Sequence, residues 1–331
     1  MGKTNLLDAI FFLSFCKSYT NLPDSQIISH SADFCVLQGS YLLEGNPEEV
    51  YCGIKRRHRK HFKRNKKEYE KLSDHIGFLP LVMVSPADTD LIQGVSEDRR
   101  KFVDMVISQY DKDYLRALIA YNKALEQRNA LLKTEPADIS LLEIWEEQMV
   151  VHGKIIHAKR KEFTERFLPI FKEFYQYICQ DGETIGMRYT SQLHEADLAN
   201  LLVEKRERDL LLGYSTQGIH KDDFDFLLED YLIKKTGSQG QNKTYLIALK
   251  LAQFDFLMHT GATPILLLDD IFDKLDANRV EQIIKLVAGD KFGQLFVTDT
   301  NRKYLDDILR KMNHDYALFY VEEGTIRRME E

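Results

Sequence analysis

Two acidic residues close a short apolar run in the last third of the chain. Residues 265–268 are isoleucine or leucine, and Asp269 and Asp270 follow them directly. Such a run is typical of a buried parallel strand, which would deliver both carboxylates to the carboxyl edge of a sheet. There one acid can ligate Mg²⁺ beside a nucleotide, and a second can orient water. A solvated strand end is the alternative interpretation, and the four apolar residues before the acids argue against it.

A loop of small residues precedes these acids by about 30 positions. It contains Ser238, Gly240 and Gln241, and the apolar stretch Tyr245–Met258 follows. A small-residue loop that opens a helix presents free backbone N–H groups to an anion. Taken alone, the loop is equally well an ordinary glycine turn that caps a helix. Its spacing from Asp269 favours a loop that completes the nucleotide site of a neighbouring subunit.

The first residues match the end of a phosphate-binding loop. In the pattern G-x-x-x-x-G-K-[ST], Gly2, Lys3 and Thr4 are the last three positions. The lysine would reach the β- and γ-phosphates, and the threonine hydroxyl would ligate Mg²⁺. We therefore predict nucleotide contacts from Gly2, Lys3 and Thr4, and a Mg²⁺ site made by Thr4 and Asp269. Asn5–Leu13 is the helix expected after the loop.

Composition limits the class of protein. The chain has 331 residues, 44% of them hydrophobic, and a formal net charge of −7. Its four cysteines are far apart and form no C-x-x-C pair, which indicates reduced thiols rather than a zinc site or a disulfide framework. No apolar run is long enough for a membrane span. We expect a cytoplasmic protein with no membrane partner.

The chain is expected to be mixed α/β, in the three segments 1–104, 105–205 and 206–331. The middle segment shows helical spacing over Tyr110–Leu132 and Leu141–Cys179. Because the phosphate loop at one end must meet the aspartates at the other, we interpret the middle as a helical lobe inserted into a split ATPase core. The expected strands are Phe34–Leu37, Glu49–Ile54, Leu79–Val84, Ile265–Asp269, Leu295–Thr298, Tyr316–Val321 and Thr325–Arg328.

A basic run interrupts the first segment. Within Lys55–Lys67, nine of 13 residues are lysine or arginine, namely Lys55, Arg56, Arg57, Arg59, Lys60, Lys63, Arg64, Lys66 and Lys67. A charge run is usually a solvated face, but so many like charges repel one another unless a polyanion is near. A concentrated patch on an acidic protein can dock a phosphate backbone. We predict that a hairpin presents these residues to DNA.

Four segments resemble the RecF family, which belongs to the ABC-type ATPases close to the SMC group. They occur in family order and span most of the chain. The second segment is specific to this family rather than to ATPases in general. The segments are Gly2–Ile10 with Lys17-Ser18-Tyr19, Ser85–Gly94 with Arg99–Asp104, Gly218–Asp223, and the Ser238 loop with Leu266–Asp276.

The resemblance implies a split ABC-type P-loop ATPase head with an inserted, mostly helical lobe. By this resemblance Lys3 and Thr4 belong to the Walker A motif and Asp269 to Walker B, while Asp270 polarises the attacking water. Ser238, Gly240 and Gln241 match the signature motif, which meets the γ-phosphate bound by a second subunit. Asp276 falls in the loop after Walker B.

The family also implies cofactors and partners. ATP and Mg²⁺ would be the cofactors, and ATP would drive formation of a homodimer. DNA, both single-stranded and gapped double-stranded, would be the substrate for loading a recombinase at gaps. Slow hydrolysis would time release. RecR is an implied partner, and RecO is a second candidate.

Several positions depart from the family pattern. The strand and the front of the P-loop that open the family are missing before Gly2, so we expect a misassigned start codon or a truncated product. This leaves a non-hydrolysing DNA-binding or scaffold protein as the alternative function. A transporter ATPase subunit is a third class, which the basic hairpin and Ser85–Asp104 argue against. His220 with Asp222 and Asp223 could form a metal cluster; we favour a loop with a hydrogen-bonded histidine and assign no metal there.

Overall fold

Residues from both ends of the chain build one unit, and the middle of the chain builds another. The computed structural model describes residues 2–20, 22–180, 182–272, 275–289, 291–299, 315–322 and 324–329. The first unit combines Met1–Asp88 with Leu257–Glu331, and the second is Thr89–Phe256. The predicted three-segment division stays a prediction.

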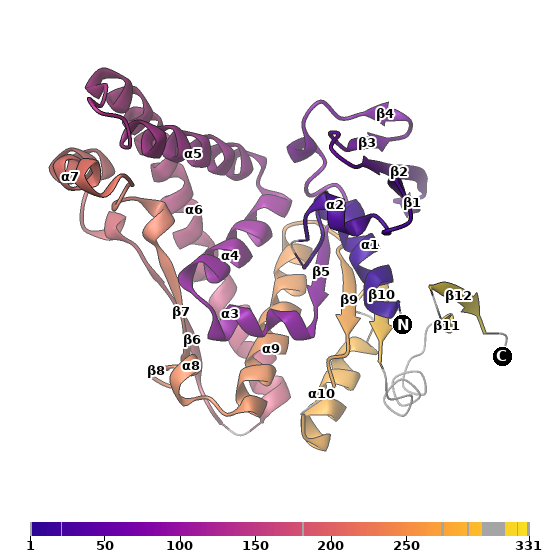
Figure 1. Cartoon of the computed structure of the whole chain (residues 1–331). Coiled ribbons are helices and arrows are strands. Elements are labelled where there is room, and N and C mark those ends of the chain that lie inside the picture. Colours follow the sequence, from indigo (N-terminus) through magenta and orange to yellow (C-terminus); the bar gives the residue numbers. More distant parts are fainter. Residues whose placement is uncertain are drawn as a thin grey trace. The chain divides into compact units, whose positions relative to one another are not determined.

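A parallel sheet in the first unit carries the candidate site (Figure 1). In its described part β9 (Ile265–Asp269) lies between β10 (Leu295–Thr298) and β5 (Leu81–Val84). The register pairs Thr298 with Asp269 and Val84 with Leu268, so the three strands end at the same edge. The three leucines of β9 are fully buried, which explains the continuous apolar run: a central parallel strand has no solvent-facing side.

Helices and an antiparallel sheet complete the first unit. Helix α1 (Lys3–Phe15) contacts β5, β9 and β10. The antiparallel sheet has the strand order β1-β2-β3-β4 and alternates exposed and more buried residues, as expected for a sheet with one face on a core. The remaining elements are α2 (Asp24–Ile27), β1 (Phe34–Leu43), β2 (Asn46–Lys55), β3 (His61–Arg64), β4 (Lys67–Glu68), η1 (Leu72–Asp74), η2 (Pro86–Asp88), α10 (Ala277–Val287), β11 (Phe319–Glu322) and β12 (Thr325–Arg328).

The second unit is mainly helical. Helix α6 (Ile139–Cys179) has 41 residues and packs along α5 (Lys112–Leu131). The aspartates before these helices cap them: Asp111 accepts from the amide of Tyr114, and Asp138 from that of Leu141. The two helices predicted over Tyr110–Leu132 and Leu141–Cys179 are confirmed, and they pack against each other. No helix in the described part of the chain is long and apolar enough to cross a membrane.

A small antiparallel sheet lies within this helical unit. Strand β6 (Ile185–Thr190) pairs with β7 (Asp223–Leu228), which pairs with β8 (Tyr231–Leu232). The sequence patterns predicted a mostly helical lobe up to residue 205 and missed both β6 and β7, strands of six residues each. The other elements are α3 (Thr89–Gln93), α4 (Ser96–Tyr110), η3 (Gln192–His194), α7 (Leu198–Leu212), η4 (Ile219–Lys221), α8 (Ile233–Thr236) and α9 (Gln239–His259).

Candidate nucleotide-binding site

The start of α1 lies at the carboxyl edge of the parallel sheet. The Lys3 ammonium donates a hydrogen bond of 2.7 Å to the backbone carbonyl of Asp299, directly after β10. Gly2 has a φ of +132°, and a Cβ there would approach Val321 to 3.3 Å. A side chain would therefore be strained at this position, which accounts for a glycine before the lysine.

Asp269 ends the central strand of the same sheet and is only 3% exposed. Its carboxylate accepts a hydrogen bond from the Thr298 hydroxyl on β10. Asp270 leaves the sheet with a left-handed backbone (φ 47°), and its N–H donates to the Thr298 carbonyl at 3.1 Å. A left-handed conformation is uncommon for residues other than glycine, although aspartate tolerates it better than most. This geometry turns the chain sharply between the two acids.

The oxygen donors at this edge fit a hard divalent cation. Asp269 supplies a buried carboxylate, and Thr4 supplies an exposed hydroxyl in the first turn of α1. Mg²⁺ prefers such oxygen ligands and typically takes few of them from the protein. Lys3, one residue before Thr4, provides the positive charge that a phosphate needs. The residues therefore fit a magnesium–phosphate ligand.

Sequence reasoning missed two residues here. Thr298 bonds to Asp269, and the Asp299 carbonyl holds Lys3. A signal existed, because β10 was expected beside β9, and parallel neighbours end at one edge. Asp276, the other acid carried over from the family, caps α10 by accepting a 2.9 Å hydrogen bond from the Arg279 amide.

The turn after α1 is fixed by acids of the same unit. Asp8 accepts from the Ser18 hydroxyl at 2.9 Å and from the Tyr19 amide at 2.6 Å. The Tyr19 hydroxyl donates to Asp88. Burial, reinforced by the nearby Asp88 carboxylate, raises the pKa of Tyr19 well above its usual range, so the hydroxyl remains a donor. These bonds explain why Lys17-Ser18-Tyr19 accompanies the phosphate-loop motif.

The small-residue loop belongs to the second unit and opens α9. Ser238 and Gln241 cap the helix reciprocally: the Ser238 hydroxyl accepts from the Gln241 amide N–H at 3.2 Å, and the Gln241 Oε1 accepts from the Ser238 N–H at 2.7 Å. This is a capping box. Gly237 before it cannot carry a side chain, because a Cβ would lie 2.8 Å from the Ile233 carbonyl oxygen. The loop is thus held in one shape.

Capping leaves a defined set of groups at the surface. Ser238 is exposed, and Gly240 is half-buried in the first turn of the helix. The first N–H groups of a helix have no intrahelical acceptor, so those of Gln239 and Gly240 are suited to bind an anion. The Gln241 side chain is different, since both ends of its amide are engaged within the unit.

The nine predicted DNA-binding cations fall into two groups. Three of them are half-buried, and each makes two or more hydrogen bonds inside the first unit. Arg56 donates to the backbone carbonyls of Ser25, Ile28 and Ser29, Lys60 donates to the carbonyl of Cys16 and to Asp24, and Arg64 forms a bidentate pair with Glu48 and stacks on Phe78.

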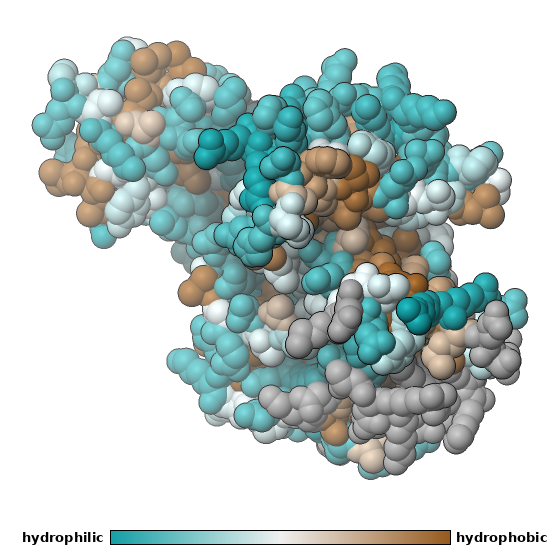
Figure 2. Space-filling view, turned by 45° about the vertical axis from the view of Figure 1, so that its right-hand side comes forward, coloured by the Kyte–Doolittle hydropathy of each residue, from teal (hydrophilic) through white to brown (hydrophobic). Residues whose placement is uncertain are grey.

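The other six cations lie nearer the surface. Lys55, Arg57, Lys66 and Lys67 are exposed. Arg59 is exposed while donating to the Glu70 carbonyl, and Lys63 lies over the Tyr51 ring. Asn65 and Lys66 both have positive φ and join β3 to β4, which is the two-residue turn typical of a tight hairpin. The predicted hairpin is confirmed, and its surface is mainly hydrophilic (Figure 2, upper right).

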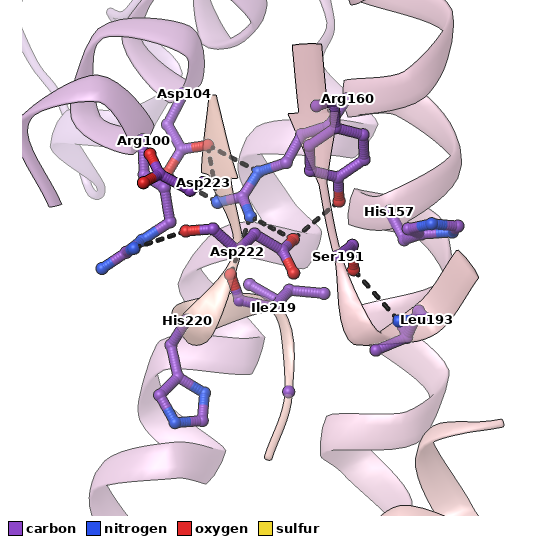
Figure 3. A network of polar contacts seen from close by, with 12 residues as sticks. Arg100, Asp104, His157, Arg160, Ser191, Leu193, Ile219, His220, Asp222 and Asp223 are labelled. Atoms are coloured by element: carbon purple, nitrogen blue, oxygen red, sulfur yellow. Dashed lines mark hydrogen bonds and ion pairs between the residues drawn. The ribbon is translucent and has the colours of Figure 1, made fainter. Parts of the chain in front are cut away.

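The His220 loop is the centre of a buried polar network in the second unit (Figure 3). Arg160 of α6, 1% exposed, bonds to Asp222 at 2.9 Å and to Asp104 of α4 at 2.9 Å. Arg99 forms a bidentate pair with Asp223, at 2.8 and 3.0 Å. The two acids of this loop thus face arginines, and the family segment Arg99–Asp104 is its partner in the fold.

His220 is held as a neutral ring. Its Nδ1 lies 2.9 Å from the Tyr121 hydroxyl, and its Nε2 lies 3.1 Å from the Ser215 carbonyl oxygen. The carbonyl can only accept, so Nε2 carries the proton and Nδ1 accepts from the tyrosine. Burial lowers the pKa of His220 to about 4. These contacts describe a structural histidine, and the described residues contain no group of three or more histidine, cysteine or acidic side chains suited to a metal.

Comparisons with known proteins give a consistent family. No protein-family model matches the chain. The chain is 64% identical over 332 residues to the DNA replication and repair protein RecF of Parabacteroides distasonis, covering 100% of this chain and 91% of that protein. It is 63% identical over 334 residues to the RecF protein of Bacteroides fragilis, covering 100% of this chain and 90% of the relative.

Solved structures agree with the sequence relatives. A chain described as the recombination mediator protein RecF-ATP in the RecFOR pathway is similar with a TM-score of 0.87 and 28% identity, covering 99% of this chain and 90% of that one. The Smc head domain of Pyrococcus furiosus has a TM-score of 0.55 at 15% identity, covering 99% and 87%, and shows the fold alone. The predicted mixed α/β class is confirmed, and the fold is that of RecF and SMC heads. The chain belongs to the RecF family of DNA replication and repair proteins.

Proposed function

We propose that this chain is the ATPase head of a recombination mediator, which binds DNA near single-strand gaps and helps to load recombinase. The observation that carries this proposal is the meeting of Lys3, Thr298 and Asp269 at one edge of the parallel sheet. A lysine at the start of a helix and an acid at the end of a central strand are the two parts from which P-loop enzymes build a phosphate site. The two ends of the chain supply them, as a split ATPase core requires.

The roles of the residues follow from their places. Lys3 would leave the Asp299 carbonyl for the β- and γ-phosphates, while Thr4 and Asp269 would hold Mg²⁺. When bound there, Mg²⁺ would neutralise charge on the transferred phosphoryl group. Asp270, turned away from the strand by its left-handed backbone, would orient the attacking water. Slow hydrolysis would then time the release of DNA, and a cytoplasmic location follows from that substrate.

The Ser238 loop would act on a second copy of the chain. Its exposed serine and the N–H groups behind it suit a γ-phosphate held by the opposing subunit, so that ATP joins two heads. A two-fold dimer would contain two such composite sites. By family likeness RecR, with RecO as a second candidate, would be the protein partner. The alternative function, a non-hydrolysing DNA-binding scaffold, would require neither site.

We assign DNA contact to the exposed cations of the hairpin region, which runs from the end of β2 through β3 to β4. Single-stranded or gapped double-stranded DNA offers phosphates to Lys55, Arg57, Lys66 and Lys67, with Arg59 and Lys63 beside them. Arg56, Lys60 and Arg64 remain predicted contacts of second rank, because their side chains already make hydrogen bonds inside the unit. Contacts to phosphates position the protein without reading base sequence.

The test of this function is ATP-dependent dimerisation, measured by light scattering on a chain that also carries the residues completing the phosphate loop. We expect dimers only with ATP. Ser238→Arg should abolish the dimer while ATP binding to the monomer stays unchanged. Ser140→Arg, at another exposed serine in a first helical turn, is the matched control and should dimerise normally. A wild-type protein that stays monomeric with ATP would contradict the proposed function.

A further inference from the structure

The Gln241 side chain cannot serve as a phosphate ligand in the observed arrangement. Its Oε1 accepts from the Ser238 N–H at 2.7 Å, and its Nε2 donates to Glu183 Oε1 at 2.6 Å. A carboxylate can only accept, so the Gln241 NH₂ must face Glu183 and its carbonyl oxygen must face Ser238. Glu183 therefore fixes which way round this amide lies.

Glu183 is itself held by the last turns of the long helix α6. Its Oε2 accepts from the Tyr175 hydroxyl at 2.6 Å and lies 3.3 Å from the Cys179 sulfur. Tyr175 is fully buried, and burial together with the Glu183 hydrogen bond raises its pKa far above the usual range. The hydroxyl thus stays protonated and keeps donating. Neutral donors beside a half-buried carboxylate stabilise its charged, accepting form.

A second carboxylate anchors the turn that carries Glu183. Glu229 accepts from the Thr184 amide at 2.9 Å and from its hydroxyl at 2.7 Å. The Glu229 N–H in turn donates to the Thr184 carbonyl at 2.8 Å. Glu229 thus holds the backbone before β6. Of the two acids, only Glu183 hydrogen-bonds to the loop that opens α9. Glu229 therefore anchors the turn, and Glu183 orients the loop.

We propose that Glu183 is a positioning residue for the shared nucleotide site: through Gln241 it sets the direction of Ser238 and of the N–H groups at the start of α9, and it couples that loop to the end of α6. This inference rests on the proposed function, because it assumes that the Ser238 loop meets a phosphate. In this proposal the Gln241 side chain supports the loop and does not contact the nucleotide. The helical lobe that ends in α6 then has a direct hydrogen-bonded link to the loop.

The decisive variants are Glu183→Ala, Gln241→Leu and the double variant. Misplacing a catalytic donor by about 1 Å can cost roughly a hundredfold in rate, so we expect Glu183→Ala to lower kcat at least tenfold. ATP affinity of the monomer should stay within twofold. The double variant should be no slower than Gln241→Leu alone, since both changes break one chain of bonds. Glu183→Gln retains an acceptor oxygen for Gln241 and should recover most of the rate.

The matched control is Glu229→Ala, which loosens the same turn without touching Gln241. It should keep kcat within about twofold even if its melting temperature falls as far as that of Glu183→Ala. Equal rate losses for the two alanine variants, or additive losses in the double variant, would overturn the inference and leave Glu183 a residue of general stability.

A mixing experiment separates this inference from the proposed function. In a two-fold dimer each site takes Lys3 from one subunit and the Ser238 loop from the other. Asp270 lies on the same side of the site as Lys3, and Asp270→Asn is expected to keep ATP binding. Equal amounts of Asp270→Asn and Glu183→Ala subunits should therefore recover roughly a quarter of the wild-type rate, since half the dimers are mixed and have one intact site. No recovery would overturn the inference, whereas a wild-type protein without ATP-driven dimers would overturn the proposed function itself.

Discussion

Two pairs of consecutive aspartates in this chain have opposite surroundings. Asp222 directly precedes β7 and Asp223 begins it, and the two accept hydrogen bonds from Arg160 and Arg99 respectively. Asp269 ends β9 and Asp270 follows it, and Asp269 accepts a hydrogen bond from the hydroxyl of Thr298. The first pair is neutralised within the second unit by guanidinium groups. The second pair lies in the first unit at the edge where a cationic ligand is proposed.

The difference shows that an acidic dipeptide does not by itself indicate a metal site. What distinguishes the pairs is the element before them and the position of the arginines. A central parallel strand brings its last residue to an open sheet edge, whereas a turn packed under α4 and α6 brings its acids to buried guanidinium groups. Substitutions in the first pair should therefore affect stability, and substitutions in the second pair should affect chemistry.

The largest expected effect is on stability, at Asp222. Asp222→Ala leaves Arg160 without one of its carboxylates and the Tyr189 hydroxyl without its acceptor. Removing one partner of a buried pair costs about 3–5 kcal/mol, so the free energy of unfolding by urea should fall by that amount. Asp225→Ala, three residues further along the chain, is the control: its partner Arg188 is 65% exposed, and the loss should stay below about 1 kcal/mol. Equal losses would remove the distinction between the pairs.

The next effect is on chemistry, at Asp270. In a chain with the complete phosphate loop, Asp270→Asn should slow ATP hydrolysis by about a hundredfold while ATP affinity and stability are retained, because the group that orients water is lost. Asp269→Asn should instead weaken binding of the magnesium complex of ATP. Calorimetry and phosphate release distinguish these outcomes. Hydrolysis by Asp270→Asn at the wild-type rate would show that the second pair has no catalytic member.

Sequence patterns predicted the frame of the candidate site well. The strand Leu295–Thr298 was predicted with its observed bounds, and β9 and the helix after Gly2 were placed correctly. These elements are local and strongly patterned: apolar runs of four or five residues, a motif at a helix start and tight turns. Parallel pairing of two such strands brings their last residues to one edge, and the structure pairs Thr298 directly with Asp269.

The hydrogen-bond partners of individual side chains could not be predicted from the sequence. Gln241 is bonded to a residue 58 positions away, and Arg160 to one 62 positions away. No local pattern indicates such partners, because each depends on how distant helices pack. The basic run shows the same. Four of its nine cations, Arg56, Arg59, Lys60 and Arg64, hydrogen-bond to carbonyls or acids within the unit, and no local pattern distinguishes them from the other five.

A smaller effect concerns pH and the His220 loop. The folded pKa of His220 is about 4, below the unfolded value of about 6.5. Between pH 4 and pH 6.5 this histidine binds more protons in the unfolded chain than in the folded one. Its contribution to stability is therefore fully present above pH 6.5 and is lost as the pH falls through this range. The neutral ring should contribute about 2 kcal/mol of stability that is lost between pH 7 and pH 5. His220→Gln should show a shallower dependence in urea unfolding, and His58→Gln, at an exposed histidine, should match the wild type.

The smallest expected effect separates the two groups of cations. Replacing Lys55, Arg57, Lys66 and Lys67 with glutamine should weaken duplex binding about tenfold at moderate salt, equally across sequences, because these side chains would bind phosphates. The slope of log affinity against log salt should become shallower by roughly 0.9 for each phosphate that the variant no longer neutralises. ATP affinity should not change, since none of these residues contacts Lys3 or Asp269 in the described hydrogen bonds.

A control with the same change of charge completes this comparison. Lys101, Arg116, Lys154 and Arg166 are exposed cations of the second unit that pair with acids. Replacing these four with glutamine alters net charge by the same amount, so any weakening due to overall charge should appear in both proteins. Titration of labelled duplex at several salt concentrations would measure each slope. If affinity and slope fall equally in both proteins, the hairpin has no special role, and the DNA surface must lie on another part of the chain.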